Sequence, residues 1–161
     1  MNANRTVEVI IAPSGEIQID AVEFKGPDCE KATKFLEEAM ISNSAYGGTY
    51  GGGAYQSVLS NCTLAGNSGS FGGGANSSTL INCLVSNNVA GTGGGASGGV
   101  LNNCLIVSNS ANTGGGSYDC TLNRCVIRSN SALNYGSGGG LCGGTANGCL
   151  IVGNSAHTEE P

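Results

Sequence analysis

A Gly-Gly-Gly triplet recurs through the second part of this 161-residue chain, and its spacing restricts the fold more than any other feature. The triplets follow one another at intervals of 21, 21, 21 and 24 residues, beginning at Gly51, Gly72, Gly93, Gly114 and Gly138. A period of this size is typical of a solenoid, in which each repeat buries its apolar face only against its neighbours. We therefore predict that residues 42–161 form a stack of about five and a half similar coils.

The composition of each coil indicates strands rather than helices. Residues 72–92, taken as one coil, contain three short extended pieces, many glycine and β-branched residues, and no two-residue turn that could form a hairpin. Such pieces would pair with their counterparts in the next coil as parallel strands. The usual crossover preference makes the winding right-handed. The predicted fold class is therefore all-β, a right-handed parallel β-helix (solenoid) with coils of 21 to 24 residues.

Two residue types hold a fixed position in every coil, counted from the first glycine of its triplet. Position twelve is always cysteine, namely Cys62, Cys83, Cys104, Cys125 and Cys149. Position seventeen is always asparagine, namely Asn67, Asn88, Asn109, Asn130 and Asn154. By period-two alternation, position twelve shares a face with the aliphatic position fourteen, so thiols and aliphatic side chains would line one wall of the core. We expect the asparagines at a turn, bonding the backbone locally and stacking as a ladder, and the small residues of position nineteen at a tight corner.

Positions thirteen and fifteen face outward on this assignment, although many of them are apolar. The apolar members, which we call the candidate contact stripe, are Leu84, Leu105, Val107, Val126, Leu150 and Val152. An apolar stripe on an outer wall is unusual for a monomer and therefore predicts a contact surface. The alternatives are that the assignment is off by one position or that a loop covers the stripe.

The first part of the chain is a different kind of sequence. Twelve of the seventeen charged residues lie in the first 43 positions, whereas 27 of the 29 glycines follow them. Alternating apolar and polar residues around a Pro-Ser-Gly turn predict a β-hairpin, with Val7, Val9 and Ile11 opposite Ile17, Ile19 and Ala21. Apolar spacings of three and four predict an amphipathic helix over residues 29–41. We expect residues 1–41 to form a ββα module that caps the solenoid, because an uncovered solenoid end exposes core and unpaired backbone.

This module resembles a known family. Its segment VEVIIAPSGEIQIDAVEFKGPDCEKATKFLEEAM, residues 7–40, is similar to a family of short bacterial proteins classified only as a domain of unknown function. The resemblance implies no activity, because none is established for the family. Members continue past the helix into a tail of their own, which repeats replace here. The resemblance therefore also implies a designed or chimeric fusion of two sequences.

The repeats resemble those of chlamydial-type polymorphic outer membrane proteins. The resemblance rests on a triplet followed by alanine and a later aliphatic-x-x-Asn, as in residues 72–75 with residues 85–88. The family's phenylalanine is replaced by Leu, Val or Ile, and we recognise no membrane barrel after the repeats. What the resemblance implies is the β-helix fold and, more remotely, the role of a surface adhesin.

Charge and hydropathy argue against several classes of partner. The charged residues after position 43 are Asp119, Arg124, Arg128, Glu159 and Glu160, and the formal net charge of the chain is −5. A surface for nucleic acid or an anionic membrane would need clustered Lys or Arg, so neither partner is expected. We recognise neither a membrane-spanning stretch nor an export signal, and expect a soluble chain as written, without assigning a cellular location.

The side chains that could carry chemistry are sparse. Stacked cysteines point the same way and bridge poorly, and no C-x-x-C pair exists for a metal, so the eight cysteines are interpreted mainly as small buried hydrophobes. A glycosidase needs two carboxylates, whereas the repeats before the tail contain Asp119 alone. Asp119, Arg124 and Arg128 are interpreted as a solvated surface group, and His157 as part of the tail. We predict no catalytic residue, cofactor or metal.

These observations favour a non-catalytic structural scaffold that self-associates end to end or side by side. The alternative is a binding or adhesion module from a bacterial surface protein, with a glycan or a protein as its ligand. Carbohydrate stacking would favour a single column of exposed aromatics, and the five tyrosines do not suggest one. A fragment of a carbohydrate-active enzyme is a remote third hypothesis.

Overall fold

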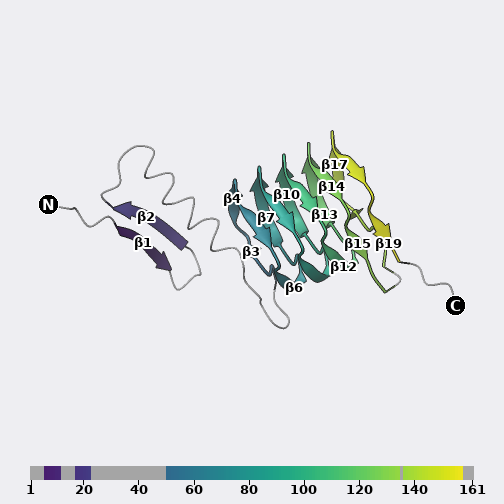
Figure 1. Cartoon of the computed structure of the whole chain (residues 1–161), viewed down its shortest axis with the longest axis horizontal. Coiled ribbons are helices and arrows are strands. Elements are labelled where there is room, and N and C mark those ends of the chain that lie inside the picture. Colours follow the sequence, from purple (N-terminus) through teal and green to yellow (C-terminus); the bar gives the residue numbers. More distant parts are fainter. Residues whose placement is uncertain (1–5, 12–16, 23–49, 135, 158–161) are drawn as a thin grey trace. The chain divides into compact units, whose positions relative to one another are not determined.

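The chain divides into two compact units, Met1–Met40 and Ile41–Pro161. The computed structural model describes residues 6–11, 17–22, 50–134 and 136–157. In the first unit, strands β1 (Thr6–Ile11) and β2 (Ile17–Val22) pair antiparallel (Figure 1). Val9 lies opposite Ile19 and Ile11 opposite Ile17, as the alternation predicts. The turn between these strands, the predicted helix of residues 29–41 and the predicted half-coil before Gly51 lie outside the described residues.

The second unit is a parallel β-solenoid of about five coils, which confirms the predicted stack of parallel strands (Figure 1). Its first sheet contains β3 (Ala54–Tyr55), β4 (Val58–Ser60), β7 (Ala75–Ile81), β10 (Ala96–Asn102), β13 (Ser117–Asn123), β16 (Leu141–Cys142) and β17 (Thr145–Asn147). The second contains β5 (Thr63–Ala65), β8 (Leu84–Ser86), β11 (Leu105–Val107), β14 (Val126–Arg128) and β18 (Leu150–Val152). The third contains β6 (Ser68–Phe71), β9 (Val89–Thr92), β12 (Ser110–Thr113), β15 (Ser131–Ala132) and β19 (Ser155–Ala156). The described residues contain no helix.

The chain turns at positions one, six, eleven and sixteen, where φ is positive. In the coil that starts at Gly72 these residues are Gly72, Ser77, Asn82 and Asn87, with φ of 61°, 50°, 54° and 55°. Left-handed backbone is open to glycine and, at lower cost than for most other residues, to short polar side chains that bond locally. This requirement explains why glycine, asparagine and serine occupy most of the corners.

The coils stay in register although one of them is longer. The coil that starts at Gly114 has 24 residues, and its three extra residues lie between Leu133 and Ser137, because the Gly114 amide bonds the Ser137 carbonyl as the Gly93 amide bonds the Thr113 carbonyl. Beyond this insertion Leu122 still pairs with Ala146, Ile127 with Ile151 and Ala132 with Ala156. The insertion is therefore confined to the connection between the third sheet and the next triplet.

The core is a set of stacked columns inside the coils. Its largest fully buried apolar side chains belong to positions nine and fourteen, namely Leu64, Leu80, Val85, Leu101, Ile106, Leu122 and Ile127. Position nineteen also faces the core, because Ala90, Ala111 and Ala132 are buried within third-sheet strands. The predicted corner at that position is therefore wrong. The corner lies three residues earlier, at position sixteen, because alanine tolerates positive φ poorly.

The second and third glycines of each triplet are required by close packing. A Cβ built on Gly94 would lie 2.4 Å from both the Gly115 and the Ser110 carbonyl oxygens. The Gly94 amide donates to the Gly114 carbonyl at 3.0 Å, so successive triplets are hydrogen-bonded to one another. A side chain here would force these backbones apart.

Candidate functional site

The asparagines of position seventeen form a buried ladder through the core. Asn67, Asn88, Asn109 and Asn130 are each at most 1% exposed. The Asn109 Oδ1 accepts from the Asn88 backbone amide at 3.0 Å and from the Asn88 Nδ2 at 2.9 Å. The Asn109 Nδ2 donates to the Val85 carbonyl and to the Asn130 Oδ1, both at 2.9 Å. The predicted ladder is present, but its backbone bonds join neighbouring coils instead of closing a local turn.

The hydrogen-bond donors and acceptors of this inner ladder are engaged within the core of the solenoid. Each carboxamide has two N–H donors and one oxygen with two lone pairs, and the inner Asn109 engages all four. No buried side-chain nitrogen or oxygen of the described residues lacks a hydrogen-bond partner. These asparagines therefore have no free donor or acceptor for a ligand.

The cysteines of position twelve form a second internal column. Cys62, Cys83, Cys104 and Cys125 are buried and Cys149 is half-buried, and the seven cysteines of the described residues are thiols outside any disulfide. The Cys104 amide donates to the Cys125 Sγ at 3.4 Å, and the Cys104 Sγ donates to the Asn102 carbonyl at 3.3 Å. Hydrogen bonds with the Cys125 and Cys83 thiols, together with burial, raise the pKa of Cys104. The thiols thus bond to one another and to backbone.

One further thiol is buried outside this column. Cys120 lies in β13, and its Sγ donates to the Tyr118 carbonyl at 3.3 Å. Burial raises the pKa of Cys120 to about 12. A thiol with such a pKa stays protonated at neutral pH and is a poor nucleophile.

The candidate contact stripe is continuous at position thirteen only. Leu84, Leu105, Val126 and Leu150 are register partners on the second sheet; the first three are half-buried and Leu150 is 59% exposed. At position fifteen, Val107 pairs with Ser86 and Arg128, and Arg128 pairs with the exposed Val152. The predicted stripe is therefore one apolar column beside a column that polar residues interrupt.

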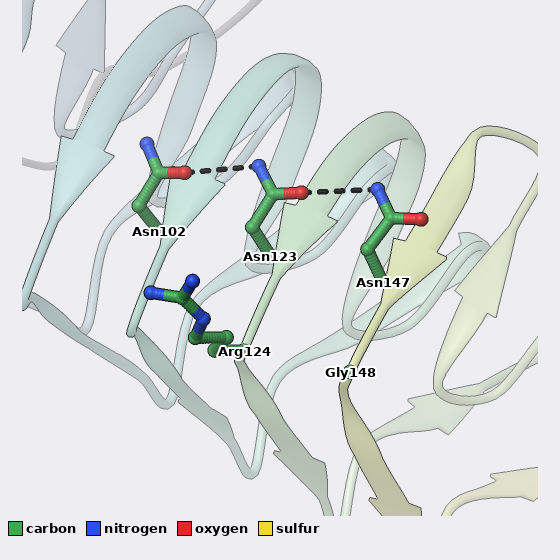
Figure 2. A pocket seen from close by; sticks show the side chains of 5 residues that line it. All are labelled: Asn102, Asn123, Arg124, Asn147 and Gly148. Carbon is green, nitrogen blue, oxygen red and sulfur yellow. Dashed lines mark hydrogen bonds between the residues drawn. The ribbon is translucent and has the colours of Figure 1, made fainter.

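A second row of asparagines lies on the outside of the solenoid, at position ten. We call Asn102, Asn123 and Asn147 the outer amide row (Figure 2). The Asn123 Nδ2 donates to the Asn102 Oδ1 at 2.9 Å, and the Asn147 Nδ2 donates to the Asn123 Oδ1 at 3.0 Å. Asn102 and Asn123 are half-buried and Asn147 is exposed, so these amides remain accessible.

Arg124 lies beside the outer amide row and shares a hollow with it (Figure 2). The hollow has a volume of about 440 Å³ and is lined by Asn102, Asn123, Arg124, Asn147 and Gly148. Arg124 is exposed and occupies a corner with φ of 52°. Asp119 and Arg128 of the same coil are also exposed but do not line this hollow.

Arg124 is predicted above as part of a solvated surface group, and the outer amide row is not predicted. The sequence does contain a sign of both, because asparagine occupies position ten in three successive coils and Arg124 replaces the asparagine or glycine found at position eleven elsewhere.

Exposed aromatic rings gather at the first triplet. Tyr50, Tyr55 and Phe71 are all exposed. The ring centroids of Tyr50 and Phe71 lie 5.5 Å apart in a stacked arrangement, and those of Tyr50 and Tyr55 lie 5.7 Å apart. Tyr55 occupies position five in register with Asn76, so this group belongs to the outer surface of the first coils.

The described residues hold no group of three or more His, Cys, Asp or Glu side chains placed to bind a metal ion. They also contain no helix long and apolar enough to cross a membrane.

Comparison with known proteins identifies only the first part of the chain. A family described as "Protein of unknown function (DUF2997)" matches residues 7–44, which confirms the resemblance of the N-terminal segment. No curated protein and no solved structure matches the chain. The resemblance of the repeats to polymorphic outer membrane proteins, and the fusion of two sequences, stay predictions.

Proposed function

We propose that this chain is a non-catalytic structural scaffold built on a right-handed β-solenoid. The observation that carries the proposal is the complete hydrogen bonding of the inner asparagine ladder. Every donor and acceptor of the Asn109 carboxamide bonds a neighbouring residue of the core. The thiol column is likewise bonded within the core. Residues that repeat in every coil thus serve the packing of one coil on the next, which is the requirement of a solenoid.

The N-terminal unit is proposed to cap the solenoid. Support comes from the family match, which ends at residue 44, close to the start of the glycine-rich repeats. A cap would protect apolar core and unpaired strand edges at that end. The same seam in composition supports a chimeric or designed origin, and a survey of genomes for natural chains that join both parts would test that origin.

Self-association is part of the proposed scaffold role. In the last coil, Leu150, Ile151 and Val152 of β18 are all exposed, and Ile151 is 46% exposed although position fourteen is buried in the earlier coils. Among the described strands, β18 and β19 each pair on one side only, and exposed apolar side chains beside such an edge favour association.

Hydrogen exchange on the full chain tests the scaffold. We expect strands β7 to β15 to exchange slowly and together, because each of the coils that they form has a neighbouring coil on both sides. A binding or catalytic module draws its working segments from the least stable part of the fold. Fast exchange confined to one segment inside β7 to β15 would contradict the proposal.

A binding or adhesion module is the second candidate. The observation that favours it is the exposed aromatic group of Tyr50, Tyr55 and Phe71, since clustered aromatics on a surface often mark a contact site. It would gain support if substitution of these rings abolished binding to a glycan or protein while the exchange pattern stayed unchanged.

A further inference from the structure

Arg124 breaks the pattern of the repeat at a place where the pattern favours stability. Position eleven is otherwise Asn61, Asn82, Asn103 or Gly148. All five residues have φ between 52° and 60°, a region that glycine and asparagine tolerate best. The Arg124 amide is held there by a 2.8 Å bond to the Asn147 carbonyl. A long charged side chain on strained backbone indicates a role beyond folding.

The Arg124 guanidinium is free to bind a ligand. Within the part of the chain that the structure describes, it forms no ion pair and no side-chain hydrogen bond. A guanidinium presents five N–H donors in a planar fork that matches two oxygens of an oxyanion. Gly148, one coil further on, lines the hollow without a side chain, and a Cβ there would only touch the Arg124 Cγ, at 3.8 Å. The hollow thus gives an anion access to the guanidinium.

The outer amide row adds hydrogen-bonding groups at regular intervals. Asn123 uses one Nδ2 hydrogen and one Oδ1 lone pair within the row, which leaves one of each. Asn102 keeps both Nδ2 hydrogens, and Asn147 keeps its Oδ1. Successive amides are one strand spacing apart, about 4.8 Å. A ligand that lies along this row needs groups that both donate and accept, as hydroxyl groups do.

We propose that Arg124 and the outer amide row bind an acidic oligosaccharide, with the guanidinium on a uronate carboxylate and the amides on sugar hydroxyls. A free phosphate or sulfate would satisfy Arg124 but not the row. A neutral sugar would satisfy the row but leave the guanidinium without its anion. The proposal goes beyond the scaffold role, which requires no ligand.

The test uses the full chain, a galacturonic acid oligomer as the probe, and isothermal titration calorimetry. Arg124→Asn restores the usual residue of position eleven, so this variant should be at least as stable as the parent. A charge-assisted bond contributes about 1.5–3 kcal/mol, so its loss should weaken binding about tenfold or more. Arg128→Gln removes the same charge from the same coil outside the hollow and should change the affinity less than about twofold.

Two control ligands, inorganic phosphate and a neutral galactose oligomer, are titrated against the same full chain. Both should bind at least about tenfold more weakly than the uronate oligomer. The proposal would be overturned by equal affinity of Arg124→Asn and the parent, by an equal loss in Arg128→Gln, by phosphate binding as tightly as the oligomer, or by no binding of the oligomer. None of these outcomes bears on the hydrogen-exchange test, so failure of the site and failure of the scaffold role are distinguishable.

Discussion

At the scale of single residues, the inner asparagine ladder shows how polar side chains can stabilise a core. A buried carboxamide with unmet hydrogen bonds is destabilising, whereas the bonds of Asn109 are complete. Each amide also polarises the next, as expected for a chain of hydrogen bonds in a medium of low dielectric constant. The stability of the ladder therefore depends on every one of its members.

Replacing one inner member should be far more costly than replacing an outer one. Asn109→Ala leaves the Asn88 amide and Nδ2 and the Val85 carbonyl without their partner. Each unpaired buried group costs about 1–3 kcal/mol, so the free energy of unfolding should fall by about 3 kcal/mol or more.

The matched control is Asn102→Ala in the outer amide row, where water can replace the lost partner. It should cost about 1 kcal/mol or less. Urea midpoints at unchanged slope measure both values. Equal losses in the two variants would show that burial of the ladder is not what makes it stabilising.

At the scale of elements, the triplets hold the first and third sheets together. The backbone of one triplet passes so close to the next that the Cβ position of Gly94 lies 2.4 Å from two carbonyl oxygens. Glycine here is required by contact, whereas at the corners it is favoured by positive φ. These two requirements can be separated by experiment.

Gly94→Ala should destabilise the solenoid by about 3 kcal/mol or more, the upper end of the range for overpacking, because both contacts are with backbone. Gly66→Ala is the control: φ is 68° and nothing lies within 4 Å of its Cβ position. Only the left-handed backbone penalty of about 1–2 kcal/mol should appear there. Thermal unfolding of the two variants compares the effects, and a smaller loss for Gly94→Ala would refute the steric argument.

The sequence predicts the elements well and their outer contacts poorly. The repeated cysteines, such as Cys83, and the aliphatic position fourteen identify inward positions, whereas the asparagines are predicted at a turn and Asn88 is buried in the core. Period-two alternation also fixes the register of β1 with β2. Outward residues have no such constraint, so the hollow beside Arg124 could not be predicted without knowing which side chains become neighbours across coils. The interruption of the contact stripe at Arg128 follows from register in the same way.

At the scale of the whole solenoid, the coils are not equally protected. The inward residues of β8, β11 and β14 are fully buried, whereas all three residues of β18 are exposed. In a solenoid each coil is stabilised by its neighbours, so a coil with one uncovered side is the least stable. That coil and the position-thirteen column are the two surfaces through which association would occur.

Two substitutions distinguish the modes of association. Ile151→Lys puts a charge on the uncovered cross-section and should abolish end-to-end assembly. Leu105→Lys puts a charge in the middle of the position-thirteen column and should abolish side-by-side assembly. Val58→Lys, at a residue 75% exposed on β4, is the control and should change neither. Light scattering over a range of concentrations measures the mass, and a strict monomer for the parent chain would refute self-association.

The three extra residues between Leu133 and Ser137 have a consequence for how this fold can change. They lengthen one connection, yet Leu122, Ile127 and Ala132 keep their partners in the following coil. The chain rejoins the stack through the Ser137 carbonyl, which accepts from the Gly114 amide at 2.9 Å. Doubling the length of a flexible loop costs only about 0.6 kcal/mol. This connection is thus a tolerant insertion point, where evolution or a protein engineer could graft a longer peptide without disturbing the core.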